Sequence, residues 1–326
     1  MSADCAVCYV SDVNFLLPSI VSAIGVRKFV PAHKADILIF TVGVEAGKSE
    51  ATDQFLQTYG IRAVSLDERA FSQIDKERLS KSHTPMAMFG RLFMDDLLPE
   101  ACKRIVYIDG DTWVERDPSA LIDAVVPEGR FAAAEDTIFF RQNMGFGKTT
   151  EEIRAYFKGL NLDRKYGYFN SGIFATSRTT WKTISQEAYA YYLENADACE
   201  HSPDQSALNA IMGDRRLRLS SKWNFQTQYR FWGVERFVEP CIYHFNRFPK
   251  PWMGPCDPWK EMYPKYQGAI APFAPLQLPL KTISAEQLAE CNAIVDKSYS
   301  YLKLPFVSRL ALLSMGYQSI ERSSWL

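Results

Sequence analysis

Short apolar runs alternate with segments of helical spacing along the first half of the chain. Runs rich in β-branched residues predict buried strands at 5–12, 36–44, 61–66 and 104–109. Apolar residues at helical spacing predict helices between these strands, at 16–29, 47–59 and 86–99. Strands that alternate with helices pair mostly in parallel. The pattern therefore predicts an α/β fold in which helices flank a mostly parallel sheet.

The second half of the chain is less regular. Its pattern predicts a strand at 168–177 and helices at 178–196 and 202–212. Ser202 is the expected cap of the last helix, with Pro203 at its first position. Gln205 follows Ser202 at the S-x-x-Q spacing, so its simplest interpretation is that it closes a capping box there, while Asp204 serves the helix dipole.

The pattern of residues 276–326 predicts a helical extension, which follows a domain that spans residues 1–275. Ser284 and Gln287 have the spacing of a capping box, which predicts that a helix begins there. Beyond Pro305, apolar residues recur at helical spacing, namely Phe306, Leu310, Leu313, Tyr317 and Ile320, with Arg309 and Arg322 nearby. Such a stripe either lies on a membrane surface, with Trp325–Leu326 as an anchor, or packs on the rest of the chain. Both interpretations stay open here.

Composition narrows the class of protein. The chain has 326 residues, of which 47% are apolar, as is ordinary for a globular protein. Its net charge of −1 gives no electrostatic reason to expect nucleic acid as a partner. The apolar stretch at 13–26 contains Asn14 and Pro18 and is shorter than a membrane span of about 20 residues. With seven cysteines and no pair of zinc-ligand motifs, we expect reduced thiols and a cytoplasmic chain, with peripheral contact at the inner face of the membrane as an open alternative.

The predicted strand at 104–109 ends in Asp109-Gly110-Asp111. Residues two apart in an extended chain point the same way, so the two carboxylates repel unless a cation lies between them. Hard oxygen ligands suit Mg²⁺ or Mn²⁺. Gly110 would let the backbone turn where the strand ends. The alternative is an ordinary acidic turn.

Two later residues could complete this site. His244 follows a short apolar run, and its imidazole would complete a metal sphere begun by two carboxylates and favour Mn²⁺. Lys250 could neutralise a phosphate bound to the same metal. Taken alone, His244 is more simply interpreted as a core histidine. Arg91 lies among apolar residues, and we expect it to pair with a neighbour such as Asp95.

Five separated motifs, in this order, resemble the motif series of glycosyltransferase family 8. They are VSDVNFLLPSIVSAI, FGRLFMDDLLPEACKRIVYIDGDTWVERD, YFNSGIFATSRTTW, PDQSALN with KWNF, and YHFNRFPKPW, within roughly residues 5–255. The resemblance implies a GT-A fold, which is a Rossmann-like nucleotide-sugar domain with a metal-binding DxD motif. It implies transfer of a hexose from a UDP-sugar, UDP-glucose or UDP-galactose first among them, to a hydroxyl of a saccharide or glycolipid acceptor. The anomeric configuration would be retained. Bacterial members of the family build lipopolysaccharide.

The resemblance also implies roles for residues at the donor nucleotide. Asp109, Asp111 and His244 fall on the ligands of Mn²⁺, with Mg²⁺ as the alternative metal, and Lys250 falls on the lysine that contacts the diphosphate. The nucleoside would be contacted by Val10, Asp12 and Asn14, and the base pocket lined by Met86. Arg247 stands where the family often has a glycine close to a phosphate. There the guanidinium could supply charge directly, or the backbone could still reach the phosphate.

Further positions match residues that hold the sugars. Arg91, Asn170, Asp204 and Gln205 fall on positions that bind the donor sugar, with Gln205 near the anomeric carbon. Asp136 matches a carboxylate that faces the acceptor. Because an amide is a poor nucleophile, we favour front-face attack of the acceptor hydroxyl, with Asp204 as the nucleophile of the competing double displacement.

Other classes of protein share parts of this pattern. A nucleotidyltransferase could use a similar sheet and acidic metal site, but it would be expected to have a Gly-rich basic loop after the first strand, where this chain has SDVNFLLPS. A glycoside hydrolase needs carboxylates on opposite sides of its substrate. A non-catalytic nucleotide-sugar-binding protein would not need the metal ligands and Lys250 together.

Overall fold

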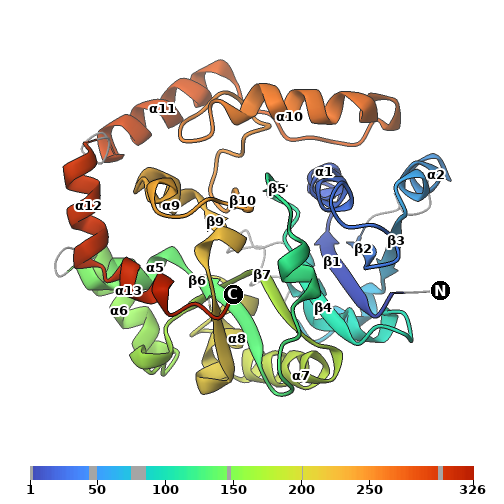
Figure 1. The fold of residues 1–326 in the computed structure, drawn as a ribbon, viewed down its shortest axis with the longest axis horizontal. Helices are drawn as coiled ribbons and strands as arrows, with labels where there is room; N and C mark the ends of the chain where they lie inside the picture. The colour runs from blue at the N-terminus through green and yellow to red at the C-terminus, as the bar shows by residue number, and fades with distance from the viewer. Residues whose placement is uncertain (1–2, 44–49, 75–85, 145–147, 200, 300–303) are drawn as a thin grey trace.

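The computed structural model of the chain describes residues 3–43, 50–74, 86–144, 148–199, 201–299 and 304–326. Its centre is a seven-stranded sheet of order β3-β2-β1-β4-β7-β6-β8 (Figure 1). The strands are β1 (Cys5–Ser11), β2 (Asp36–Val42), β3 (Ile61–Leu66), β4 (Arg104–Ile108), β6 (Phe131–Glu135), β7 (Phe169–Ser177) and β8 (Arg216–Leu219). Only β7 runs antiparallel to its neighbours, which are β4 and β6. The predicted α/β fold with a mostly parallel sheet is confirmed.

Helices cover both faces of this sheet (Figure 1). The α-helices before residue 280 are α1 (Leu16–Arg27), α2 (Glu50–Thr58), α4 (Ser119–Asp123), α5 (Thr137–Arg141), α6 (Lys148–Gly159), α7 (Arg178–Glu194), α8 (Pro203–Met212), α9 (Thr227–Phe231) and α10 (Met262–Ile270). Short 3₁₀ turns include η2 (Glu68–Phe71), η5 (Gln142–Met144), η6 (Arg164–Tyr166), η7 (Gly213–Arg215), η8 (Ser221–Trp223), η9 (Val234–Arg236) and η10 (Ala271–Leu276). Alternate residues of β1 pack into two different cores. Val7 belongs to the core of α1, and Cys8 to the core of α7 and α8.

A second sheet of three short strands brings distant segments together at the edge of the large one. Its order is β5 (Thr112–Val114), β10 (Ile242–His244) and β9 (Phe225–Gln226). β10 runs antiparallel to β5, so His244 pairs with Thr112, and the amide of Phe245 donates to the carbonyl of Asp111 at 2.8 Å. This register places His244 beside the end of β4.

The segment 86–99 differs from the expected amphipathic α-helix. It forms two 3₁₀ helices, η3 (Met86–Phe93) and η4 (Asp95–Leu97). All four residues from Phe89 to Leu92 are buried, because η3 packs against β1 and β2 as well as α7 and α8. A Cβ on Gly90 would lie closer than 3.0 Å to Val10 Cγ1. Burial on several sides leaves no polar face, so tertiary packing overrides the helical period.

The C-terminal residues form three helices: α11 (Ala285–Tyr299), α12 (Pro305–Ser314) and α13 (Tyr317–Arg322). The capping box that begins α11 is confirmed, since the Ser284 amide donates to Gln287 Oε1 at 3.0 Å and the Gln287 amide donates to Ser284 Oγ at 3.1 Å. The helical spacing from Phe306 to Ile320 suggested one helix, but the structure has two, α12 and α13. Gly316 has a φ of 72°, a left-handed value that favours glycine, and it separates α12 from α13.

The apolar stripe of the extension divides into two sets. Tyr317 is buried, with Leu312 and Met315, in the core that also contains Trp223. Phe306, Leu310 and Leu313 are exposed, at 72%, 49% and 52%. The stripe therefore packs along one side only on the core that contains Trp223. The division of the chain at residue 275 stays a prediction.

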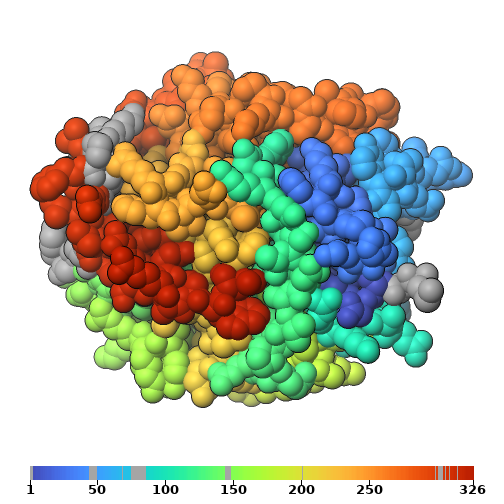
Figure 2. Space-filling view, in the orientation of Figure 1, coloured from blue at the N-terminus to red at the C-terminus, as the bar shows by residue number. Residues whose placement is uncertain are grey.

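The last residues lie against the large sheet instead of projecting as an anchor. The Trp325 amide donates to the Arg218 carbonyl at 2.7 Å, and Trp223 Nε1 donates to the Leu326 carbonyl at 3.1 Å. Figure 2 shows this red segment lying across the yellow one. Within the described parts of the chain, every helix is too short or too polar to cross a membrane.

Candidate functional site

A cavity of about 580 Å³ opens where β1 and β4 end. The predicted site residues that line it are Val10, Asp12, Arg91, Asp109, Asp111, Asp136, Asn170, Gln205, His244 and Arg247. Four predicted residues do not line it. Lys250 contacts Asp111 and Asp204 contacts Arg91, and both of these partners line the cavity. Asn14 is exposed. Met86 does not line the cavity itself, but its neighbours Ala87 and Met88 do. Parallel strands present ligands at their carboxyl ends, and this cavity has that position in the fold.

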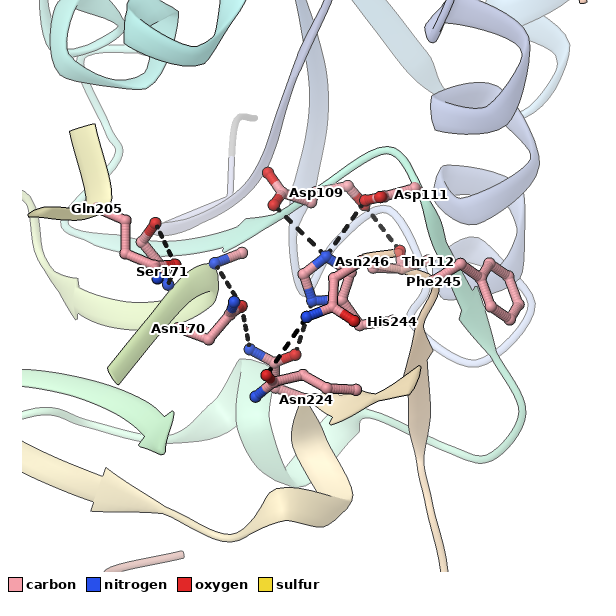
Figure 3. Close-up of polar contacts among 12 residues, drawn as sticks. Asp109, Asp111, Thr112, Asn170, Ser171, Gln205, Asn224, His244, Phe245 and Asn246 are labelled. Atoms are coloured by element: carbon pink, nitrogen blue, oxygen red, sulfur yellow. Dashed lines mark hydrogen bonds and ion pairs between the residues drawn. The ribbon is translucent and has the colours of Figure 1, made fainter. Parts of the chain in front are cut away.

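Asp109, Asp111 and His244 form a compact cluster in the cavity (Figure 3). One ligand atom from each lies within 4.8 Å of the others. His244 Nε2 is 3.3 Å from Asp111 Oδ1 and 3.6 Å from Asp109 Oδ2. The end of β4 supplies the two carboxylates, and the pairing of β10 with β5 supplies the imidazole. Two carboxylates with one imidazole fit a divalent cation such as Mn²⁺ or Mg²⁺.

Two glycines make the cluster sterically possible. A Cβ on Gly172 in β7 would lie closer than 3.0 Å to His244 Cε1 and to Asp109 Oδ2. A Cβ on Gly110 would meet Ser19 Oγ of α1 at a similarly short distance. The φ of Gly110 is not in the left-handed region. Close packing of α1, and not a turn of the backbone, therefore requires the glycine between the two aspartates.

Lys250 balances the charge of this cluster. Its Nζ is 2.7 Å from Asp111 Oδ2, and it also donates to the Phe245 carbonyl. Burial would raise the pKa of Asp111, but Lys250 and His244 outweigh burial and hold this pKa well below its ordinary value. Asp111 is thus held as a carboxylate, the form that binds a cation. Lys250 lies where it could instead meet an anionic ligand.

Arg91 joins the cluster to the buried Asp204. Its Nη2 is 3.0 Å from Asp109 Oδ1, and its Nε is 2.9 Å from Asp204 Oδ2. The expected pair with Asp95 is wrong, because Asp95 pairs with Arg178 at 3.2 Å. An α-helix would place residues 91 and 95 on one face, whereas two separate 3₁₀ helices do not. Burial raises the pKa of Asp204, although Arg91 acts in the opposite direction.

Gln205 and Asp136 meet on the other side of the cavity. The capping-box interpretation of Gln205 is wrong, since the Ser202 side chain makes no cap hydrogen bond. Gln205 Oε1 instead accepts from the Ser171 amide at 2.9 Å, and its Nε2 donates to Asp136 Oδ2 at 3.1 Å. Asp136 Oδ2 also accepts from Asn170 Nδ2 at 2.9 Å. Tertiary contacts to β7 and Asp136 thus hold Gln205. The S-x-x-Q spacing from Ser202 therefore does not indicate a capping box here.

Two side chains that the sequence did not single out support the cluster. Tyr107 donates from its hydroxyl to Asp109 Oδ1 at 2.8 Å. It stands two residues before Asp109 in β4, and that spacing could have indicated a shared face. Asn224 Oδ1 lies 2.8 Å from His244 Nδ1. It belongs to the KWNF motif, for which no role was assigned.

Arg247 lines the cavity and reaches towards the C-terminal extension. Its Nη1 donates to the hydroxyl of Tyr299, the last residue of α11, at 3.4 Å. Tyr299 in turn donates to Gln228 Oε1 at 3.2 Å. Arg247 was expected either to supply positive charge directly or to let its backbone approach a phosphate. Its position in the cavity wall fits the direct supply of charge.

Comparison with known proteins connects this site to a family. The family model described as Glycosyl transferase family 8 matches residues 6–255. General stress protein A of Bacillus subtilis (strain 168) is 30% identical over 192 residues, which are 53% of this chain and 62% of that protein. The lipopolysaccharide glucosyltransferase WaaO of Escherichia coli (strain K12) is 23% identical over 314 residues, 91% of this chain and 87% of that protein.

A solved structure shares the fold. The galactosyltransferase LgtC, in complex with donor and acceptor sugar analogs, superposes with a TM-score of 0.66 at 19% identity. The match covers 86% of this chain and 98% of LgtC. The expected GT-A fold is confirmed.

Proposed function

The chain belongs to glycosyl transferase family 8 and is a glycosyltransferase, and from this premise we propose that it moves a hexose from a UDP-sugar to a hydroxyl of a saccharide or glycolipid acceptor. UDP-glucose and UDP-galactose are the proposed donors. The observation that carries the proposal is the cluster of Asp109, Asp111 and His244, beside Lys250, in one cavity with Gln205 and Asp136. A coupled assay of UDP release over a panel of UDP-sugars tests it. Release from none of them, with any saccharide acceptor, would contradict it.

The donor set fits a divalent cation, which we propose to be Mn²⁺ with Mg²⁺ as the alternative. Asp109, Asp111 and His244 would hold it, and Gly172 leaves the space. When bound, the cation supplies electrostatic stabilisation to a leaving diphosphate. Lys250 would add its own charge there by exchanging Asp111 for a phosphate oxygen. Arg247, which lines the cavity, would add a second positive charge near the diphosphate.

The contacts around Asp204 support front-face attack with retention. Asp204 is 1% exposed, pairs with Arg91 and does not line the cavity, so it is badly placed as a nucleophile. Gln205 lines the cavity and lies beside Asp136. We propose that Gln205, Asn170 and Arg91 orient the donor sugar while Asp136 faces the acceptor hydroxyl. The departing phosphate oxygen would then take the acceptor's proton.

Replacing Gln205 by alanine should lower turnover more than it weakens UDP binding. The amide acts at the sugar, and loss of one polar contact to a reacting centre commonly costs about 100-fold in kcat. Steady-state kinetics together with the UDP-induced rise in Tm would separate the two effects. Should the variant melt early yet keep its turnover, Gln205 would have only a structural role.

UDP should stabilise the protein more than GDP or ADP at equal concentration. Val10 and Asp12 line the cavity, and we propose that they, with Asn14 and the wall near Met86, contact the nucleoside. Saturation at 100 times Kd stabilises a protein by about 2.7 kcal/mol, which melting curves detect readily. The comparison is made with Mn²⁺ present in every sample. Equal shifts for the three nucleotides would refute selectivity for uridine.

The likeness to WaaO supports a place in lipopolysaccharide biosynthesis, with the reaction in the cytoplasm. The acceptor would then be a growing saccharide on a lipid. Contact with the membrane through Phe306, Leu310 and Leu313 has no support among the relatives and stays a prediction. Co-sedimentation of the full chain with anionic liposomes tests it, and a triple serine variant at these exposed positions is the control.

A further inference from the structure

Asn224 occupies a buried position between His244 of the metal cluster and Asn170, which contacts Asp136. It follows η8 and precedes β9, and none of its surface is exposed. Its side-chain oxygen lies 2.8 Å from His244 Nδ1, and its Nδ2 donates to Asn170 Oδ1 at 2.9 Å. Figure 3 shows Asn224 with one end towards His244 and the other towards Asn170. One amide thus contacts both His244, in the metal cluster, and Asn170, which we propose to orient the donor sugar.

The backbone of β7 determines which way these amides point. The Gly172 amide donates to Asn170 Oδ1 at 3.0 Å, and a backbone N–H can only donate, so this atom of Asn170 is the oxygen. The group of Asn224 that faces the oxygen must then be its NH₂. Consequently the oxygen of Asn224 faces His244. Because a carbonyl oxygen only accepts, Nδ1 of His244 must carry the proton.

When the ring carries a single proton, as it must to bind a cation, this tautomer leaves the lone pair of His244 on Nε2. Nε2 is the nitrogen that lies 3.3 Å from Asp111 and 3.6 Å from Asp109. The same reasoning extends to the acceptor side. With its oxygen fixed, Asn170 donates through Nδ2 to Asp136, and Gln205, whose oxygen accepts from the Ser171 amide, donates to the same Asp136 oxygen. The donor and the acceptor are therefore known for each hydrogen bond in the series His244–Asn224–Asn170–Asp136.

We propose that Asn224 is the positioning residue of this site. Its carbonyl sets the tautomer and the ring orientation of His244 for a cation, and its NH₂ holds Asn170, which in turn holds Asp136. The metal cluster and the acceptor carboxylate are thereby aligned through one buried side chain. Outer residues of this kind commonly change metal affinity or activity by about 10- to 100-fold. The assignment of Asp136 to the acceptor rests on the proposed function, whereas the assignment of the tautomer does not.

Two variants separate the two ends of Asn224. Asn224→Asp keeps an acceptor for His244 Nδ1–H but cannot donate to Asn170. Asn224→Leu, of similar size, loses both contacts. Asn209→Leu is the matched control, because Asn209 is also a buried amide in the same region, with bonds to the Phe169 backbone and the Gln205 carbonyl, but does not contact the cluster. All three should lower Tm.

The first measurement is the binding of Mn²⁺ alone, followed through the EPR signal of free Mn²⁺. Asn224→Leu should weaken binding by about 10- to 100-fold, while Asn224→Asp and Asn209→Leu should stay within about threefold of the parent. In turnover, Asn224→Asp should nevertheless lose about 10-fold or more through Asn170 and Asp136. Equal losses of Mn²⁺ affinity in Asn224→Leu and Asn209→Leu would reduce Asn224 to a packing residue and overturn the proposal.

The second measurement is the tautomer of His244 in the metal-free protein, by long-range ¹H–¹⁵N NMR at a pH high enough for the ring to carry a single proton. The chain has four histidines, and the signal that disappears in His244→Gln identifies the residue. The parent and Asn224→Asp should have the proton on Nδ1, and Asn224→Leu should not hold it there. A parent protein with the proton on Nε2 would overturn the proposal. Failure of the parent to bind Mn²⁺ would count against the proposed metal dependence only, because the NMR result needs neither metal nor turnover.

Discussion

Asp111→Ala is expected to lose transfer by several orders of magnitude while the chain still folds. The carboxylate lies 3.3 Å from His244 Nε2 and 2.7 Å from Lys250 Nζ, so its removal takes one ligand from the cluster. Stabilisation of a leaving group by a cation is commonly worth several kcal/mol, which corresponds to about a thousandfold in rate or more. Kinetics with a UDP-sugar, together with Mn²⁺ titration, measure the loss.

The effect on folding should be smaller than the effect on rate. Without Asp111, Lys250 keeps the Phe245 carbonyl as a partner, and the repulsion between the two aspartates is relieved. Asp117→Asn is the matched control, because Asp117 lies outside the cavity, two residues before the start of α4, where it accepts from the Ser119 amide at 2.8 Å. If Asp111→Ala stayed fully active, or if the parent worked at full rate in EDTA, the metal assignment would be wrong.

Gly172→Ala should disable the site by adding a single methyl group. The new Cβ would lie closer than 3.0 Å to His244 Cε1, Asp109 Oδ2 and Asn170 Oδ1. None of these atoms moves freely, because Asn224 holds His244 and Arg91 holds Asp109. The three groups must therefore separate. We expect turnover and Mn²⁺ affinity to fall at least 100-fold, with a loss of about 1–3 kcal/mol in the free energy of unfolding.

The control for this variant is Gly268→Ala. Gly268 lies in α10, its added Cβ would meet no atom within 4 Å, and its φ is not left-handed. Alanine is favoured over glycine in a helix by up to about 1 kcal/mol, so this protein should melt at the same temperature or higher. Turnover and Mn²⁺ affinity should match those of the parent. Normal Mn²⁺ binding by Gly172→Ala would show that the cluster is looser than its geometry indicates.

The parts of the structure that local pattern determines were predictable from the sequence. β1 and β4 are short apolar runs, and the cap of α11 needs only Ser284 and Gln287. The proposed ligands Asp109, Asp111 and His244 were predicted from their chemistry and their motifs, and the structure brings them together. What brings them together was not predictable. It is the register of β10 on β5, a pairing between segments about 130 residues apart that leaves no local periodicity.

The errors share one physical cause. Gln205, Arg91 and the segment 86–99 were each interpreted from neighbours in sequence, and in each the partner is distant. A buried polar group must be satisfied by whatever the fold places beside it, and the cost of leaving it unsatisfied exceeds the gain from a cap or a surface pair. Asn224 was overlooked for the same reason, since its significance depends on two partners that only the tertiary structure places beside it.

The strand order has a consequence for synthesis of the chain on the ribosome. β2 pairs with both β1 and β3, so these three strands can associate as soon as they emerge. β4 and its two aspartates follow early, but Gly172 and His244 arrive much later. A nascent chain that ends before residue 244 would carry paired carboxylates with no imidazole and no Lys250 beside them. Catalytic competence is therefore acquired only after residue 250 has been made, well after the first strands have a partner.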